Sequence, residues 1–282
     1  MKIALSGGTG FIGSHFLRQA LDAGHNIIAI RRSPSSSPRI PLSKFPSWLD
    51  RQLDEVSADE LIGCDVLVHL AAHTGNVPYD TLTKCLYWNL TAVLALFQQA
   101  RLAGIRRFIV AGSCFEYGRS GEYFEEIPTN APLEPTNSYA ASKSAASIAL
   151  CQWAKEYNLS LELLRVFHVY GEGELETRFW PSLRRAALCG DDFLMSFGEQ
   201  IRDFQKVDRV AEAFLSRAIS SSINHSEVSI FNLNSNNFLS IRDFATQAWS
   251  ELGATGSLLI GKLPYRENEV MRFLPGASSL AI

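Results

Sequence analysis

The 282-residue sequence contains only five cysteines, and they are not arranged as a metal site or a redox motif requires. They stand at positions 64, 85, 114, 151 and 189, with no CxxC spacing between any two of them. An odd number of widely spaced cysteines favours neither a disulfide framework nor a zinc site. We therefore expect no bound metal and a reducing, cytoplasmic location.

The sequence also lacks an excess of charge of one sign and any long apolar run. Its 26 Lys and Arg against 29 Asp and Glu give a formal net charge of −3, which is no reason to expect a nucleic-acid partner. The longest apolar stretches, such as AVLALF, fall far short of the ~20 residues of a membrane span. The apolar run in the N-terminal MKIALSGG is too short for a signal peptide. With 46% hydrophobic residues, a soluble globular protein without a membrane partner is predicted.

The motif GGTGFIG, residues 7–13, stands between a predicted strand and a predicted helix. The apolar run KIALSG precedes it, FIGSHFLRQALDAG continues with helical spacing up to Gly24, and the strand-like NIIAI follows. Amides at a helix start bind phosphate, and glycines let the phosphate approach the backbone. This βαβ context predicts a dinucleotide site. Its expected members are Gly7, Gly10, Phe11, Ile12 and Gly13.

Strands and helices continue to alternate up to Tyr170. The expected strands are CDVLVHLAA, RRFIVAGS and LSLELLRVF, and the expected helices are LYWNLTAVLALFQQARLAG and SYAASKSAASIALCQWAKEYN. The alternation predicts an α/β fold, a Rossmann-type doubly wound parallel sheet. Beyond Tyr170 the alternation is less regular and arginines stand among aromatics. We predict an NADP-binding Rossmann domain over 1–170 and a smaller, mainly substrate-binding portion over 171–282, interleaved with it.

The end of the second predicted strand reads IRRS, where an acidic residue would bind the adenosine ribose. Guanidinium groups can instead grip a 2′-phosphate and stack on adenine. Arg31 and Arg32 therefore favour NADP over NAD. The alternative is that both are solvated surface arginines.

Tyr139 and Lys143, in SYAASK, are four residues apart and so share one face of a predicted helix. A nearby ammonium stabilises tyrosinate and lowers the tyrosine pKa towards the working pH, as proton transfer requires. Ser113 ends a predicted strand and could polarise the same substrate oxygen.

Together these motifs resemble the extended short-chain dehydrogenase/reductase family, the NAD(P)-dependent sugar-nucleotide epimerases, dehydratases and reductases. GGTGFIG is similar to its GxxGxxG loop, GSCFEYG to its Ser/Thr segment and SYAASK to its YxxxK motif. RVFHVYGEGE and QIRDFQKVDRVA resemble two further family stretches. HLAA resembles the strand end that lines the cofactor, which implies roles for Leu70, Ala71 and Ala72. Asn89 stands where the family has a helix asparagine that supports the active site.

The resemblance implies hydride transfer between the nicotinamide and a sugar carbon. Tyr139 would exchange the proton of the oxygen on that carbon. Lys143 would hold the nicotinamide ribose and tune Tyr139, and Ser113 would hydrogen-bond to the oxygen.

The branch of the family depends on the residues after Ser113. The 4,6-dehydratases carry an Asp-Glu pair there, whereas this sequence has Cys114 and Phe115, so dehydration is not expected. The arginine-lined cofactor end suits net reduction, and GSCFEYG, YGEGELETRFWP and IRDF look like reductases of nucleotide-linked 4-keto-6-deoxyhexoses. NADPH-dependent ketosugar reduction in deoxysugar biosynthesis is therefore the first hypothesis. A nucleotide-sugar 4-epimerase with the same three residues is the alternative, and a non-catalytic NADP-binding sensor is the third.

Substrate contacts follow more loosely from the resemblance. Arg178, Arg202 and Arg266 fall in segments that bind nucleotide diphosphate, although each could instead form a structural ion pair. His168 replaces the usual asparagine and could donate to a phosphate or pack in the core, and His73 could line the sugar pocket. The chain ends at MRFLPGASSLAI, earlier than relatives usually do, so either the protein is compact or its C-terminal portion is reduced. The family also implies a homodimer, built from the helices that contain Asn89 and Tyr139.

Overall fold

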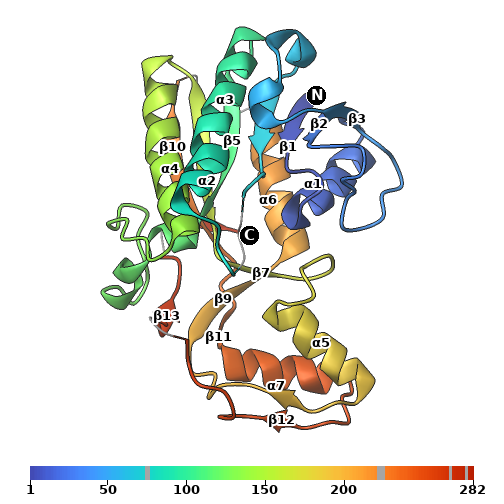
Figure 1. Ribbon diagram of the computed structural model, residues 1–282, viewed down its shortest axis with the longest axis vertical. Coiled ribbons are helices and arrows are strands. Elements are labelled where there is room, and N and C mark those ends of the chain that lie inside the picture. The colour runs from blue at the N-terminus through green and yellow to red at the C-terminus, as the bar shows by residue number, and fades with distance from the viewer. Residues whose placement is uncertain (74–76, 221–225, 267–268, 277–278) are drawn as a thin grey trace.

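The computed structural model describes residues 1–73, 77–220, 226–266, 269–276 and 279–282, and an eight-stranded parallel sheet forms its centre (Figure 1). The strand order is β14-β10-β6-β5-β4-β1-β2-β3. These strands are β1 (Lys2–Ser6), β2 (Asn26–Arg31), β3 (Ser47–Asp50), β4 (Val66–His69), β5 (Arg107–Ser113), β6 (Ser160–Val166), β10 (Val228–Asn234) and β14 (Leu280–Ala281). The helices are α1 (Phe11–Asp22), α2 (Leu82–Leu86), α3 (Ala92–Leu102), α4 (Ser138–Glu156), α5 (Phe179–Cys189), α6 (Val207–Ile219) and α7 (Ile241–Glu251). The predicted fold class is confirmed.

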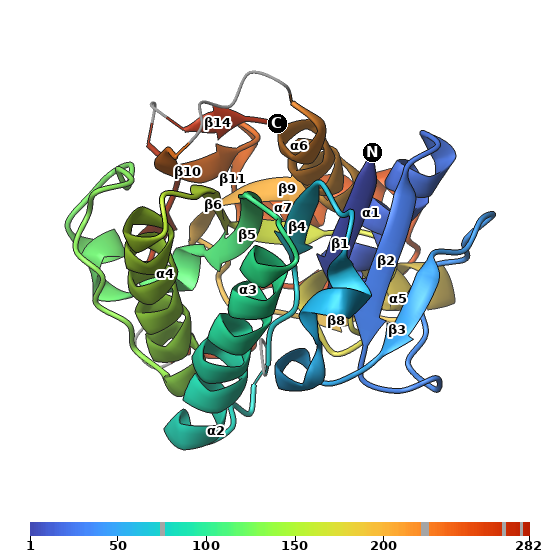
Figure 2. The ribbon, with the colours of Figure 1, turned by 90° about the horizontal axis from the view of Figure 1, so that it is seen from above.

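Helices cover both faces of the sheet: α3 and α4 lie on one face, and α1 and α6 on the other (Figure 2). The alternation within β1 explains this arrangement. Ile3 and Leu5 pack against Phe16 of α1 and Phe214 of α6, whereas Ala4 faces the cluster of α3 and α4. Both faces of the central strands are therefore apolar, as buried parallel strands require.

A second, smaller portion lies below the sheet in Figure 1 and contains α5 and α7. Its core joins Leu183 of α5 to Ala245 and Trp249 of α7. Short strands complete it: β7 (His168–Tyr170), β8 (Phe193–Leu194), β9 (Ile201–Lys206), β11 (Phe238–Ser240), β12 (Leu258–Leu259) and β13 (Arg272–Phe273). Residues 171–282 do not all belong to this portion, because α6, β10 and β14 return to the large sheet.

Several elements differ from the expectations drawn from the sequence, and the strands β10 and β14 of the large sheet have no counterpart among the predicted strands. The edge strand β3 has no counterpart among the predicted strands, and it pairs with β2 through contacts such as Arg31 opposite Asp50. The helix expected over 86–104 is interrupted by a π-helical turn, Tyr87–Thr91, between α2 and α3. Within the described residues, no helix is both long and apolar enough to cross a bilayer.

Candidate active site

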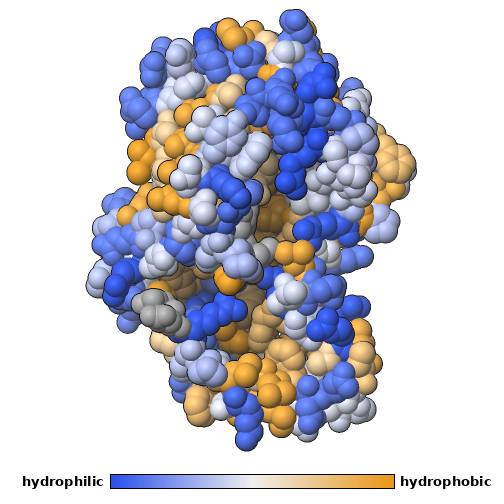
Figure 3. Space-filling model, in the orientation of Figure 1, coloured by the Kyte–Doolittle hydropathy of each residue, from blue (hydrophilic) through white to orange (hydrophobic). Residues whose placement is uncertain are grey.

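A cavity of about 720 Å³ opens at the carboxyl edge of the sheet, where the strand order reverses between β1 and β4. Its wall combines the glycine loop with residues at the ends of β2, β4, β5 and β6, with α4, and with the segment that leads into α5. Figure 3 shows this face of the molecule hollowed between the sheet portion and the α5–α7 portion. The volume is in the range of sites that bind small organic ligands, about 300–1,000 Å³.

The glycine loop brings bare backbone to the floor of this cavity. Gly7 has φ +84°, and a Cβ there would stand 2.4 Å from the backbone nitrogen of Ala71. A Cβ on Gly13 would stand 2.0 Å from the carbonyl oxygen of Gly7. Within the described chain, no side chain caps the first turn of α1, which begins after Gly10. This backbone fits the pyrophosphate of a dinucleotide, because uncapped helix amides and the helix dipole attract phosphate.

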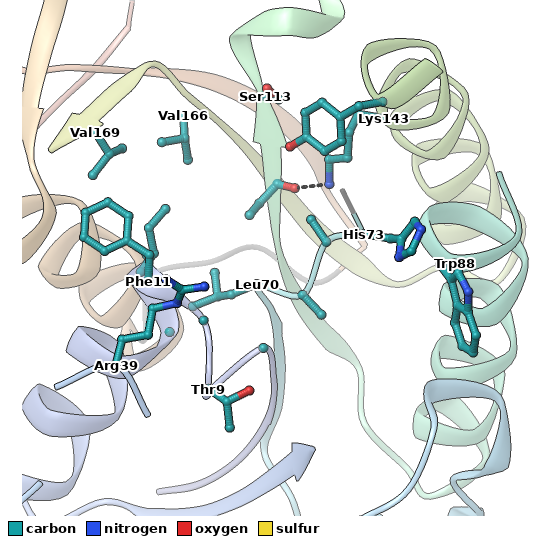
Figure 4. A pocket seen from close by; sticks show the side chains of 18 of the residues that line it. Thr9, Phe11, Arg39, Leu70, His73, Trp88, Ser113, Lys143, Val166 and Val169 are labelled. Atoms are coloured by element: carbon teal, nitrogen blue, oxygen red, sulfur yellow. Dashed lines mark hydrogen bonds between the residues drawn. The ribbon is translucent and has the colours of Figure 1, made fainter. Parts of the chain in front are cut away.

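Ser113, Tyr139 and Lys143 meet at one end of the cavity. Ser113 is the last residue of β5, and the other two lie one turn apart on α4; Figure 4 shows Ser113 and Lys143 together. All three are at most 9% exposed. The Ser113 side chain hydrogen-bonds to the Tyr139 phenol, and Lys143 Nζ donates to the carbonyl oxygen of Ala111 at 2.7 Å.

Burial dominates the protonation of this group. It raises the pKa of Tyr139, and the hydrogen bond with Ser113 opposes the rise while the charge of Glu116 adds to it. Burial lowers the pKa of Lys143, opposed by the same Glu116 charge. Lys143 is not among the groups that shift the Tyr139 pKa in this arrangement, so its predicted effect on that pKa stays a prediction. The phenol is protonated at neutral pH and needs additional positive charge beside it to act as a base.

Glu116 holds Ser113 in place from behind. Ser113 N donates to Glu116 Oε1 at 2.8 Å, and Arg165 Nε donates to Glu116 Oε2 at 2.8 Å. Ser147 Oγ donates to the same oxygen, and Arg165 also donates to the Tyr117 hydroxyl. Such a buried pair is tolerable because hydrogen bonds satisfy its polar atoms. The end of β5 is thus fixed by a network that the serine motif alone does not reveal.

Asn89 does not line the cavity but fixes two of its walls. Its Oδ1 accepts from the backbone of His73 at 2.7 Å, and its Nδ2 donates to Ser142 Oγ at 2.9 Å. Ser142 in turn donates to the carbonyl oxygen of Tyr139. Asn89 lies in the π-helical turn, a distortion frequent at functional sites. It therefore positions the loop after β4 relative to α4.

The two arginines at the end of β2 differ from each other. Arg31 Nε donates to Asp50 Oδ1 at 2.6 Å, its Nη1 donates to the Ser36 carbonyl oxygen at 3.3 Å, and its guanidinium lies 4.5 Å from the Trp48 ring centre. Arg32 is exposed, and no hydrogen bond or ion pair engages its guanidinium within the described residues. The structure thus corrects the picture of two equivalent open arginines: Arg31 ties β2 to β3.

Two further arginines, which the sequence analysis did not identify, lie with Arg32 at the end of the cavity away from Ser113. Arg39 and Arg51 both line the cavity, and Figure 4 shows Arg39 and Thr9 on the side away from Ser113. Arg39 Nη1 donates to the Gly173 carbonyl oxygen at 3.4 Å, and Arg51 pairs with Glu60 at 3.1 Å. No motif in the sequence marks the segment around Arg39. The hydrogen bond from Arg39 to Gly173, a residue far away in the sequence, holds this segment at the cavity.

The five expected substrate residues separate into two groups. His73 and Arg178 line the cavity. Arg202 is buried against the segment before β13 and donates to Glu269 and the Val270 carbonyl oxygen.

The remaining two expected substrate residues, His168 and Arg266, also lie outside the cavity lining. Arg266 is exposed. His168 packs edge-on against Phe115 and Phe273, and burial with two nearby arginines lowers its pKa well below 6.5. Its Nδ1 is buried without a hydrogen-bond partner in the described part of the chain. It is a neutral ring behind the cavity wall.

The other expected cofactor residues line the cavity, and so do several that local patterns did not suggest. Phe11 and Ile12 of α1 and the strand-end residues Leu70, Ala71 and Ala72 are in the wall. The unexpected members include Thr9, Gln52, Leu53, Trp88 and Glu174. Thr9 stands inside GGTGFIG and could have been included with the motif. The others come from the segment after β3, the π-helical turn and the segment between β7 and α5, whose positions depend on the whole fold.

Comparison with known proteins gives a consistent result. Residues 3–232 match the model of the NAD dependent epimerase/dehydratase family. A UDP-glucose 4-epimerase from Corynebacterium glutamicum is 25% identical over 261 residues, which cover 86% of this chain and 78% of the epimerase. A CDP-abequose synthase from Salmonella muenchen is 26% identical over 217 residues, 76% of this chain and 69% of the synthase.

The solved structures include a UDP-N-acetylglucosamine 4-epimerase from Methanobrevibacter ruminantium in complex with UDP-N-acetylmuramic acid. It superposes with a TM-score of 0.86 over 98% of this chain and 89% of its own, at 23% identity. At that identity the match shows the fold.

Proposed function

Because the chain belongs to the NAD dependent epimerase/dehydratase family, we propose that it is a nucleotide-sugar 4-epimerase acting through Ser113, Tyr139 and Lys143. The observation that carries the proposal is the convergence of these three buried side chains at one end of a cavity whose floor is the glycine loop. The first hypothesis from the sequence was ketosugar reduction, but the UDP-glucose 4-epimerase relative supports the alternative better.

In this proposal Tyr139 moves the proton of the hexose 4-hydroxyl. Its phenolate removes the proton, and Ser113 donates a hydrogen bond to the same oxygen as it becomes a carbonyl. A bound nicotinamide supplies a hydride acceptor that later returns the hydride, and in its oxidised form a positive charge. Lys143, one turn from Tyr139, favours the phenolate and binds ribose hydroxyls. The proton returns from Tyr139 to the oxygen on the inverted carbon.

Residues 114 and 115 support epimerisation over dehydration. Elimination of water needs an acid and a base beyond the tyrosine, and these positions hold Cys114 and Phe115. Cys114 is 1% exposed, and burial raises the pKa of its thiol to about 12, so it offers no thiolate near neutral pH.

We further propose that the substrate is a UDP-hexose and that NADP binds more tightly than NAD. The UDP-glucose 4-epimerase relative supports the first part, with Arg178 and His73 as the contacts available in the wall. Arg32, Arg39 and Arg51 support the second, since arginines suit a 2′-phosphate and Asp50 is already paired with Arg31. The family name itself indicates NAD, so the preference needs direct measurement.

Ketosugar reduction is the second candidate, supported by the CDP-abequose synthase relative and by the arginine-rich cofactor end. The two reactions differ in cofactor balance. Purified protein incubated with UDP-galactose and NADP or NAD should form UDP-glucose, seen by NMR, with no net change in absorbance at the reduced-cofactor band. Stoichiometric NADPH consumption with a nucleotide-linked 4-keto-6-deoxyhexose, without inversion of any UDP-hexose, would overturn the epimerase proposal in favour of reduction.

We also propose a homodimer through the outer faces of α2 and α4. Leu82 of α2 and Ile148 of α4 are 48% and 63% exposed, and Tyr87 in the π-helical turn after α2 is 43% exposed. Exposed apolar side chains of this kind are what interfaces cover. Light scattering on the purified protein would measure the assembly, and a monomer at micromolar concentration would contradict it.

A further inference from the structure

Glu174 is a buried carboxyl group in the cavity wall, on the segment between β7 and α5. Its side chain is 9% exposed, and Oε1 lies 3.5 Å from Arg178 Nε. Oε2 is also buried and has no hydrogen-bond partner in the part of the chain that the structure describes. Buried carboxyl oxygens are nearly always hydrogen-bonded, so an unsatisfied one beside a cavity indicates a partner that comes from outside the protein.

The charge of Glu174 is poorly stabilised where it stands. Burial raises its pKa to about 7, opposed by Arg178 and by a hydrogen bond from the backbone of Gly171. Near neutral pH the carboxyl group therefore exists in both forms, and a small change in its surroundings can decide between them.

The other elements around this segment contact mainly its backbone. Arg39 donates to the Gly173 carbonyl oxygen. His15 of α1 contacts the Glu172 carbonyl oxygen at 2.8 Å and pairs with Asp208 of α6 at 2.6 Å.

Arg178 also acts on His168 of β7, as does Arg202 of β9, and the segment itself carries the exposed Glu172 and Glu176. Of these surrounding charges, Arg178 is the one that acts directly on Glu174. The proton equilibrium of Glu174 therefore responds to whatever binds Arg178.

Resting on the proposed function, we propose that Glu174 is a proton-dependent ligand of the nucleotide sugar: in its protonated form it donates a hydrogen bond to a phosphoryl oxygen that Arg178 binds. A diphosphate that reaches Arg178 competes with the carboxylate for the guanidinium and repels it. One proton taken up from solvent removes the repulsion and turns the unpartnered carboxyl into a donor. Substrate binding is thereby coupled to proton uptake, and it weakens as pH rises above 7 because the proton must then be taken from a more alkaline solution.

The test is calorimetry of UDP-glucose binding to the NADP-loaded protein, with Tyr139→Phe in every sample to prevent turnover. Titrations in phosphate and in Tris, whose ionisation enthalpies differ, count the protons bound. UDP-glucose carries no group that titrates near pH 7. We expect uptake of more than about half a proton at pH 7.5, and affinity roughly tenfold weaker at pH 8.5 than at pH 6.5.

Glu174→Gln keeps a hydrogen-bond donor but cannot titrate. UDP-glucose binding to this variant should therefore take up no proton, and its affinity should not change over this pH range. Glu176→Gln removes an exposed carboxylate two residues away and should behave like the parent. No uptake in the parent, or equal uptake in Glu174→Gln, would overturn the role of Glu174. Binding with proton uptake but no epimerisation by the unmutated protein would overturn only the proposed function. Absence of UDP-glucose binding at pH 6.5 would overturn both.

Discussion

The two ends of the cavity are built in different ways. At the reaction end, Ser113, Tyr139 and Lys143 stand on a central strand and a long helix and are nearly fully buried. At the opposite end, where the adenosine of the proposed cofactor would lie (the adenosine end), Arg32 and Arg39 stand in exposed connections, and Arg31 is held by an edge strand. Chemistry needs atoms held within fractions of an ångström, whereas recognition of a phosphate by arginine tolerates longer and more mobile side chains.

Related proteins can therefore share the reaction end while they differ at the adenosine end. At the reaction end, Tyr139 and Lys143 are four residues apart on one helix, so their relative position is kept as long as that helix is kept. The adenosine end depends on loop residues that can be exchanged without affecting the core. We therefore expect substitutions at the two ends to change different observables.

Tyr139→Phe should have the largest effect, because it removes the group that carries the proton. We expect kcat to fall by about 10³-fold, while NADP affinity changes less than about twofold. Steady-state inversion of UDP-galactose and a fluorescence titration of the cofactor measure the two quantities. Tyr123→Phe, at a tyrosine 67% exposed, is the matched control and should be silent. Retained turnover in Tyr139→Phe would exclude the proposed mechanism.

Gly13→Ala tests the glycine loop, which forms the floor of the cavity between its two ends. The new Cβ would meet the carbonyl oxygen of Gly7 at 2.0 Å, so the start of α1 must shift. A cost of about 1–3 kcal/mol corresponds to a loss of roughly five- to 150-fold in cofactor affinity. Gly24→Ala, where nothing lies within 4 Å, strains a positive φ but leaves the cradle intact. Its stability should fall by about 1 kcal/mol without loss of cofactor affinity, and equal affinities in both variants would contradict the assigned role of the loop.

The double change Arg32→Ala and Arg39→Ala addresses the adenosine end alone. NADP affinity should weaken by about tenfold, since charge-assisted bonds to a phosphate contribute roughly 1.5–3 kcal/mol where desolvated and less where exposed. NAD affinity should stay nearly level, and so should kcat with saturating cofactor. Arg209→Ala, at an exposed arginine paired with Glu212, provides the control. Parallel weakening of NAD and NADP would remove the basis for the NADP preference.

Asp50→Asn should produce the smallest effect and act in the opposite direction. The carboxylate holds Arg31 at 2.6 Å and adds a negative charge near the expected 2′-phosphate. Its neutralisation should strengthen NADP binding by about two- to fivefold, as a partly exposed charge typically does. Calorimetry of NADP and NAD side by side would detect the shift, and a weaker NADP complex would mean that the pair organises the site rather than competing with phosphate.

Local pattern predicted much of this molecule. The strands β1, β2, β4, β5 and β6 follow from short apolar runs, helix α1 from its apolar periodicity, and helix α4 from its alanine-rich composition. The trio at the reaction end could be named for the same reason, since its spacing is a property of one helix and one strand end. The edge strand β3 was missed because it is short and half-buried, with no clear alternation.

The contacts of the arginines at the adenosine end and of the expected substrate residues could not be predicted in this way. Arg31 was expected to be free, yet Asp50 and Trp48 on the neighbouring strand engage it. Arg202 and Arg266 were expected beside the substrate, yet the fold directs them elsewhere. An arginine is long and forms ion pairs with any carboxylate within reach, so its role depends on neighbours that are distant in sequence.

The sequence by itself determined the parallel sheet, the glycine loop at residues 7–13 and the residues proposed for proton transfer. Each depends on interactions within a few residues or on burial along one element. Only the tertiary structure decided which distant charges meet: Arg31 with Asp50, and Glu116 with Arg165. The physical reason is that the strength of an electrostatic interaction depends on distance and burial, and both are set by how the elements pack.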